Sequence, residues 1–424
     1  MLNSFLRGYY TPSFYKLVVN TTYDLTNLKE LEKQPAPFST FYHEYLHFIQ
    51  DISTPFGLMN GLIILNQMKY ANNYILHGKH SFNIPVPWED HININLSRVM
   101  QLVYMGPVDR TVSGKVAFVK KVESNVFIPA PHNQYLEKII IGIESDGKPV
   151  HEIDFGGLCI IESMAHIAQK HFYPKTSHHD IPYKSAILVA EHLYPDFVKN
   201  ELYVFALCDA CLMTYHPGLN FFEALIGFKQ DGIIPKNEEE VYELVYSRIK
   251  GNERNLLDIY HEINESAKKE FTHYFTTKLY ENERVWITTI LERAYKLRTE
   301  NPTFLLDLLK QDKAKSDLFI ELILELGSPL IENLTGETHM FIPRGFENVK
   351  VQIDVFSSIN EIFQLFDSGR KSCGLKGYCK NSEEDITDWR CSEAPWQRSS
   401  DIKLCGYGVL WKTWGLSDFK PITN

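Results

Sequence analysis

Apolar residues follow different patterns along this chain, and the changes of pattern mark its organisation. Between residues 115 and 155, short runs rich in Val, Ile and Phe predict strands. The expected strands lie at 115–129, 134–144 and 148–155, with the segment SDGK at 145–148 as a hairpin turn. From residue 183 to 335, apolar residues recur at helical spacing, so this stretch is expected to be almost wholly helical.

The segment FYHEYLHFIQD, residues 41–51, is compatible with a buried helix, because most of its positions are apolar or aromatic. Two prolines in LEKQPAPFST are expected to break the chain before it, which leaves Ser39 as its N-cap. Pro55 and Gly57 should end this helix, and a second helix should follow over residues 57–76.

The glycine pair at 156–157 is expected to end the sheet and to open a helix over 158–172. Near the C-terminus, VKVQIDVF at 349–356 resembles a strand and precedes a tail rich in Cys and Trp. The predicted fold class is therefore α+β and helix-dominated, with a small sheet and a large helical region. Three regions are expected: residues 1–182, a helical region at 183–335 and a mixed C-terminal region at 336–424.

Composition narrows the possible partners and the expected location. The 424 residues are 44% apolar and carry a net charge of −10, which argues against a nucleic-acid surface. The N-terminus lacks a secretory signal pattern, and no apolar run is long enough to span a membrane. Without export, the seven cysteines are not expected to form a disulfide framework. We therefore expect a cytoplasmic protein that binds neither nucleic acid nor a membrane.

The motif His-Glu-x-x-His at residues 43–47 carries the candidate chemistry. On a helix, His43 and His47 lie on one face and can direct two imidazoles at one zinc ion. Glu44 projects beside that point, where it could accept a proton from a zinc-activated water and later deliver it to a leaving amine. The alternative is a core helix whose histidines bond to neighbouring groups.

A catalytic zinc also needs a third protein ligand and an open position. Glu162 in GGLCIIESMAHIAQ is the best candidate, because a carboxylate on an apolar helix is costly to bury unless it is paired or binds metal. His166 lies one turn further along the same face. The alternative for Glu162 is an ordinary helix carboxylate paired with a nearby cation.

HEYLH followed at a distance by IIESMAHIAQ resembles the gluzincin branch of the zincin metallopeptidases. This resemblance implies a zincin-like catalytic core in residues 1–182, with His43, His47 and Glu162 as ligands of a catalytic Zn²⁺ and Glu44 as general base. Some members have an aspartate one turn after the glutamate ligand, where this chain has His166, a candidate for an outer-shell or transition-state role. By analogy with the family, the strands at 115–155 would pair with an extended peptide substrate.

Other candidate groups have structural alternatives. Tyr215 and His216 could donate to an oxyanion, or they could cap a helix end. Cys208 and Cys211 form C-x-x-C within an apolar helix and are expected to be buried core residues. Four tail cysteines could hold a second, structural Zn²⁺ or could pack as free thiols: Cys373, Cys379, Cys391 and Cys405.

The pattern as a whole predicts a zinc-dependent metallohydrolase, a peptidase acting on a peptide or protein substrate. A regulatory protein partner, or a cover formed by residues 53–115, would restrain it. Two alternatives stay open: a helical module that binds a protein partner without catalysis, and a zinc hydrolase that cleaves a non-peptide bond.

Overall fold

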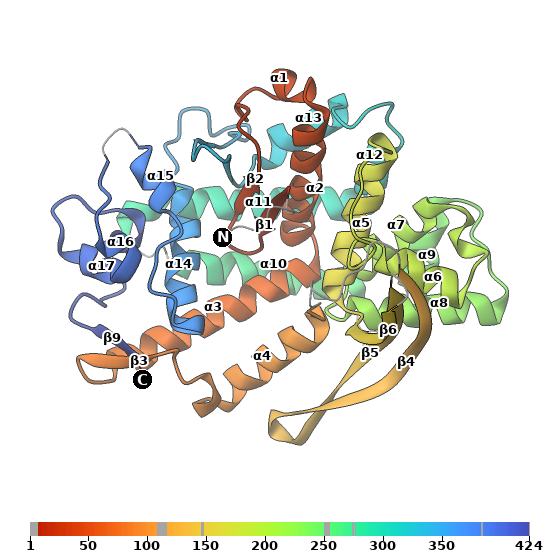
Figure 1. Cartoon of the computed structure of the whole chain (residues 1–424), viewed down its shortest axis with the longest axis horizontal. Coiled ribbons are helices and arrows are strands. Elements are labelled where there is room, and N and C mark those ends of the chain that lie inside the picture. Colours follow the sequence, from red (N-terminus) through yellow and green to blue (C-terminus); the bar gives the residue numbers. More distant parts are fainter. Residues whose placement is uncertain are drawn as a thin grey trace.

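Helices make up most of the structure, and the strands form three small sheets (Figure 1). The structure is a computed structural model that describes residues 7–107, 117–145, 148–249, 255–273, 275, 277–382 and 385–423. Among these residues, the α+β, helix-dominated class is confirmed. The central two residues of the predicted SDGK turn lie outside the described residues.

The strands predicted between 115 and 155 are confirmed as an antiparallel sheet of β4 (Ala117–Ala130), β5 (Gln134–Ser145) and β6 (Lys148–Asp154). In Figure 1 this sheet forms a curved arm that extends away from the centre of the molecule. A second sheet has the order β1-β2-β7-β8. Its strands are β1 (Gly8–Thr11), β2 (Lys16–Val19), β7 (Leu330–Glu332) and β8 (Thr338–His339). A two-stranded sheet pairs β3 (Ser81–Ile84) with β9 (Lys420–Thr423).

The motif lies on α2 (Pro35–Ile52), which is followed by α3 (Pro55–Leu76) and α4 (Ile92–Met105). The expected end of the motif helix before Pro55 is confirmed. The expected start at Ser39 is wrong, because Pro35 and Pro37 occupy the first turn of α2 rather than break the chain before it. Proline fits there because the first backbone N–H groups of a helix have no partner within the helix.

The helix predicted at 158–172 is confirmed as α5 (Gly157–Phe172), and α2 packs against both α5 and β1. Figure 1 shows α2 and α5 side by side near the middle of the molecule. A short α1 (Leu28–Glu32) precedes α2.

Within the described residues of 183–335, the predicted helical character is confirmed, apart from β7 at the end of the range. It comprises α6 (Ser185–Leu193), α7 (Glu201–Cys211), α8 (Pro217–Asp231), α9 (Glu238–Arg248), α10 (Leu256–His273), α11 (Glu281–Glu300), α12 (Phe304–Leu309) and α13 (Asp317–Leu326). In the C-terminal region lie α14 (Asp354–Ser368), α15 (Lys376–Lys380), α16 (Arg390–Glu393) and α17 (Gly406–Thr413).

The strand expected at 349–356 is wrong, since residues 349–353 form no strand and α14 begins at Asp354. Its buried residues Phe356, Ile359 and Phe363 follow helical spacing, which the short window VKVQIDVF does not reveal.

The three predicted regions share a hydrophobic core. One cluster of buried apolar residues extends from Tyr10 to Leu416 and has members in each region. The β2–β7 and β3–β9 pairings also join segments far apart in the sequence. Among the described residues, no single helix has the length and apolar character to cross a bilayer; α2 and α3 meet that test only as a pair bent by 74°.

Candidate metal centre

Three side chains from α2 and α5 converge on one point. His43 Nε2 lies 3.2 Å from His47 Nε2 and 3.3 Å from Glu162 Oε2, and His47 Nε2 lies 3.5 Å from the same oxygen. These three residues form a buried group whose ligand atoms could hold a metal ion. Ligands at about 2.0–2.1 Å from a tetrahedral metal are roughly 3.3 Å apart, so the triangle has the size of one tetrahedral face.

The packing of two helices fixes this triangle. His43 and His47 share one face of α2 because they are four residues apart, and Glu162 comes from the facing side of α5. Toward the start of α2, the Gln169 side chain donates to Ser39 Oγ at 2.8 Å and joins the helices. The packing of α2 against α5 therefore brings together the three ligands predicted from two distant motifs.

Gln50 orients the ring of His47 by bonding to Nδ1, the ring nitrogen that does not face Glu162. Its Oε1 lies 2.8 Å from His47 Nδ1, so the Nδ1–H donates to the amide oxygen and Nε2 faces Glu162. The Gln50 amide nitrogen in turn donates to the Ile161 carbonyl at 3.4 Å, next to Glu162. Such outer-shell bonds fix the tautomer and ring orientation of metal-binding histidines.

A Gln50→Ala variant is expected to bind zinc about 10–100-fold more weakly than the parent, because His47 loses the bond that fixes its ring. Competition titration against a fluorescent zinc chelator measures this change. The control is Gln230→Ala at an exposed position of α8. Equal zinc affinities for the parent and Gln50→Ala would contradict this role of Gln50.

The charges of the three groups are coupled. Burial alone would raise the pKa of Glu162, but hydrogen bonds and charge from His43 and His47 hold it well below its usual range. Burial alone would lower the pKa of His47, yet the hydrogen bond and charge of Glu162, with the charge of Glu44, raise it to about 9. At neutral pH, His47 is therefore protonated, and its positive charge balances the negative charge of Glu162. A metal ion that binds here must displace this proton.

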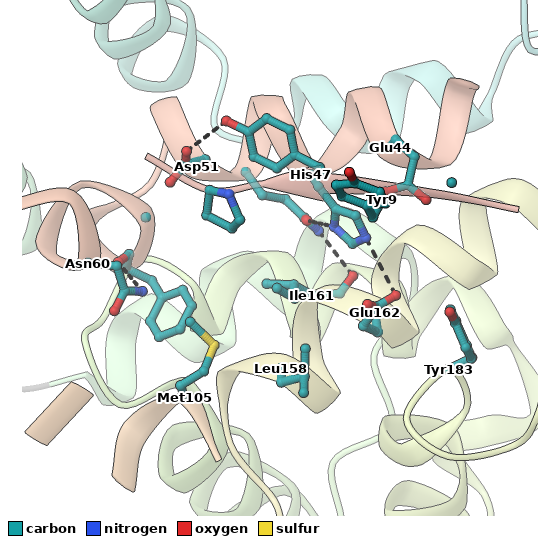
Figure 2. Close-up of a pocket in the computed structure, with 16 residues that line it drawn as sticks. Tyr9, Glu44, His47, Asp51, Asn60, Met105, Leu158, Ile161, Glu162 and Tyr183 are labelled. Atoms are coloured by element: carbon teal, nitrogen blue, oxygen red, sulfur yellow. Dashed lines mark hydrogen bonds and ion pairs between the residues drawn. The ribbon is translucent and has the colours of Figure 1, made fainter. Parts of the chain in front are cut away.

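A cavity of about 180 Å³ opens beside the triangle. Figure 2 shows Glu44, His47 and Glu162 among its lining residues, with Tyr183 on the far side from Asp51. Much of the remaining lining is apolar or aromatic, including Tyr9, Tyr10, Pro12, Phe56, Met105, Leu158 and Ile161.

Strand β1 forms one wall of this cavity through Gly8, Tyr9 and Tyr10. A Cβ at Gly8 would lie 2.6 Å from Thr40 Cγ2 and 3.3 Å from Glu44 Cγ, so the glycine permits the close approach of β1 to α2. Asp51 holds the strand by accepting from Tyr10 Oη at 2.8 Å and from the Ser13 N–H at 2.6 Å. Burial raises the pKa of this carboxyl to about 7, although both bonds oppose the shift.

His166 lies near the triad but does not line the cavity. Its ring is buried and packs 5.3 Å from that of His178, which itself stacks 5.7 Å from the His43 ring. Burial lowers the pKa of His166 to about 3, which keeps this imidazole neutral. Because it does not line the cavity, the position of His166 favours an outer-shell role behind the ligands over contact with a substrate.

His216 is engaged away from the triad. Its Nε2 donates to the Glu137 carbonyl at 2.8 Å, and its Nδ1 accepts from the Leu219 N–H at 3.4 Å as the N-cap of α8. The ring also stacks on Tyr104, with centroids 4.2 Å apart. These contacts favour the helix-cap alternative, and we assign His216 no part in the chemistry below.

Sequence reasoning missed several neighbours of the site. Gln50 was not singled out, although it lies three residues after His47. Tyr183 and His178 belong to no motif, and their ring centroids lie 4.3 Å apart. No local signal could have identified these two, because the fold alone brings their loop against the triad.

Comparisons with known proteins give no relative for this chain. No protein-family model matches it, and neither a curated protein nor a solved structure matches it. The resemblance to gluzincins therefore remains a prediction from two short motifs. Any assignment of function has to be argued from the site itself.

Proposed function

We propose that this protein is a zinc-dependent metallohydrolase that cleaves peptide bonds. The observation that carries the proposal is the triangle of His43, His47 and Glu162, whose edges of 3.2–3.5 Å fit a tetrahedral ion. Two imidazoles and one carboxylate are a ligand set found in catalytic zinc sites. The adjoining cavity leaves space for water and substrate at the fourth position.

In this chemistry, His43, His47 and Glu162 would hold the ion, and Glu44 carries the proton. When bound, Zn²⁺ would polarise the scissile carbonyl and lower the pKa of water to about 7. Glu44 accepts one proton from the water whose oxygen forms the new bond to the carbonyl carbon. As the carbon–nitrogen bond breaks, Glu44 returns that proton to the leaving nitrogen, so the products are a carboxylic acid and an amine.

The walls of the cavity support a peptide substrate. Strand β1 is the terminal strand in the order β1-β2-β7-β8, and it lines the cavity beside Glu44. An edge strand can pair with an extended peptide through backbone hydrogen bonds. The analogy had assigned this role to β4–β6, but none of their described residues lines the cavity. We therefore move the expected peptide-binding edge to β1.

The apolar lining supports a preference for a bulky apolar side chain next to the cleaved bond. An apolar cavity of about 150 Å³ holds a benzene molecule, and this cavity is of about 180 Å³. The cavity and the β1 edge favour a peptidase over the two alternatives that the sequence left open. A module without catalysis needs no cavity at the triad, and a zinc hydrolase that cleaves a non-peptide bond needs no strand edge for a peptide.

Zinc content tests the proposal. The double variant His43→Ala/His47→Ala is expected to contain one zinc ion per chain less than the parent, because two of three protein ligands are gone. Mass spectrometry of the metals in protein purified without chelators measures this difference. The control is His171→Ala/His192→Ala, two exposed histidines on α5 and α6.

Substrate profiling completes this test. The parent is incubated with a mixture of peptides that carry apolar side chains, and new termini are identified by mass spectrometry. Cleavage by the parent and not by His43→Ala/His47→Ala supports a zinc peptidase. Equal zinc content in parent and variant, or a zinc-loaded parent that cleaves no peptide, would overturn it.

A further inference from the structure

Four cysteines of the C-terminal tail gather around one small cavity. Cys373 lies in the loop after α14, Cys379 on α15, Cys391 on α16, and Cys405 directly before α17. All four line the same cavity, together with Lys376, Ile386, Pro395, Arg398 and Tyr407. Together the four supply every thiol of the chain outside the core helices α5 and α7.

The backbone already presents hydrogen-bond donors to two of these sulfurs. The N–H of Leu375 donates to the sulfur of Cys373, and the N–H of Gly408 donates to that of Cys405. In each case the donor follows its cysteine by two or three residues along the chain. Burial raises the pKa of both thiols, and these hydrogen bonds oppose that rise, so they favour the thiolate form that binds metals.

A buried cation lies against the same cavity. Arg398 is 4% exposed, and its Nη1 lies 3.6 Å from Cys391 Sγ. The guanidinium also pairs with Asp388 and Asp401, at 3.1 Å each. A cation fixed beside the sulfurs would offset part of the negative charge of four thiolates around a divalent ion.

The surrounding elements are short for a self-supporting fold. Helices α15, α16 and α17 have five, four and eight residues. Helices of this length are not stable alone, and small structural units are commonly stabilised by a bound metal or by disulfides. All four cysteines have free thiols, and the Cys373 N–H bonds to the Cys391 carbonyl at 2.8 Å, which brings two of the segments together.

We propose that Cys373, Cys379, Cys391 and Cys405 bind a structural Zn²⁺ ion that joins these short elements. Four thiolates in a closed tetrahedral set, with no open position, are typical of structural zinc sites. Among the described residues, His43, His47 and Glu162 form the only group of three or more His, Cys, Asp or Glu residues whose ligand atoms all lie within 4.8 Å of one another, so no three of the four sulfurs lie that close together. Zinc binding must therefore draw the four sulfurs inward around their cavity. This site is separate from the triad and does not depend on the proposed hydrolase activity.

Metal counting with two double variants tests the proposal. The parent should contain two zinc ions per chain, and Cys379→Ser/Cys391→Ser should contain one. The double variant His43→Ala/His47→Ala should keep the zinc of the cysteine site. The control Cys208→Ala/Cys211→Ala removes two buried thiols of α7 and should keep the metal content of the parent.

A second measurement uses folded protein without cysteine substitutions. In the His43→Ala/His47→Ala protein, titration with a mercurial thiol reagent should release one zinc ion per chain, detected with a colorimetric zinc dye. Replacing zinc with Co²⁺ should produce the strong near-ultraviolet absorption of cobalt–thiolate bonds.

Three outcomes would overturn the cysteine site: unchanged zinc in Cys379→Ser/Cys391→Ser, no zinc released by the thiol reagent, or iron with acid-labile sulfide in place of zinc. If zinc is lost only with the cysteines, the cysteine site stands and the hydrolase proposal fails. If zinc is lost only with the histidines, the reverse holds.

Discussion

A Glu44→Gln variant is expected to lose peptide hydrolysis by about 10²–10⁴-fold while it keeps its zinc. Glutamine preserves the shape of the side chain and can still accept a hydrogen bond, but it cannot take a proton from water. Glu44 is buried and lines the cavity with His47 and Glu162, so the change alters proton transfer at the site without removing a ligand of the triangle.

Initial rates on a peptide that the parent cleaves measure this effect, and metal analysis is done on the same samples. The matched control is Glu243→Gln on α9, where the glutamate is exposed. A Glu44→Gln protein that holds zinc and cleaves at the rate of the parent would refute the assignment of Glu44 as proton carrier. The triad would then be a metal site with a different base or without catalysis.

An Arg298→Met variant is expected to lower the free energy of unfolding by about 3–5 kcal/mol. The Arg298 guanidinium on α11 is 1% exposed and donates to both carboxylate oxygens of Asp209 on α7, at 2.7 Å and 2.9 Å. Tyr242 also donates to this carboxylate, at 2.9 Å. Methionine fills part of the volume but leaves the buried charge of Asp209 without its cation, which is the costly part of breaking a buried ion pair.

Urea unfolding followed by tryptophan fluorescence measures the loss. The control is Arg344→Met, because Arg344 and Glu321 form a pair that is about half exposed, and such pairs contribute about 0–1 kcal/mol. The double variant Arg298→Met/Asp209→Leu should recover much of the loss, since no charge is left buried. Equal unfolding midpoints for Arg298→Met and the parent would contradict the prediction.

Local patterns were sufficient for much of the secondary structure. The alternation and β-branched content of residues 115–155 identified β4–β6, and helical spacing identified α3, α5 and the helical region. The errors came from signals with two meanings. Proline breaks a helix interior but also starts helices, as Pro35 does, and VKVQIDVF is too short to separate strand from helix.

In the C-x-x-C segment, the sequence predicted which side chains are buried but not which of them form an ion pair. Cys208 and Cys211 are buried, as predicted. Between them, however, Asp209 is fully buried with a cation 89 positions away in the sequence. Neither residue is unusual in its local window, so the ion pair was not foreseen.

The sequence by itself determined the chemistry that each helix can offer. The spacing of His43 and His47 places two imidazoles on one face of any helix they occupy, and the apolar surroundings of Glu162 imply a partner for its charge. Only the tertiary structure decided which groups meet. The packing of α2 against α5 closes the triangle, β1 rather than β4–β6 forms the wall beside Glu44, and Gln50 fixes the His47 ring. The physical reason is that helix geometry is set by neighbours a few residues apart, whereas a metal site depends on distances between segments that only the packed core holds together.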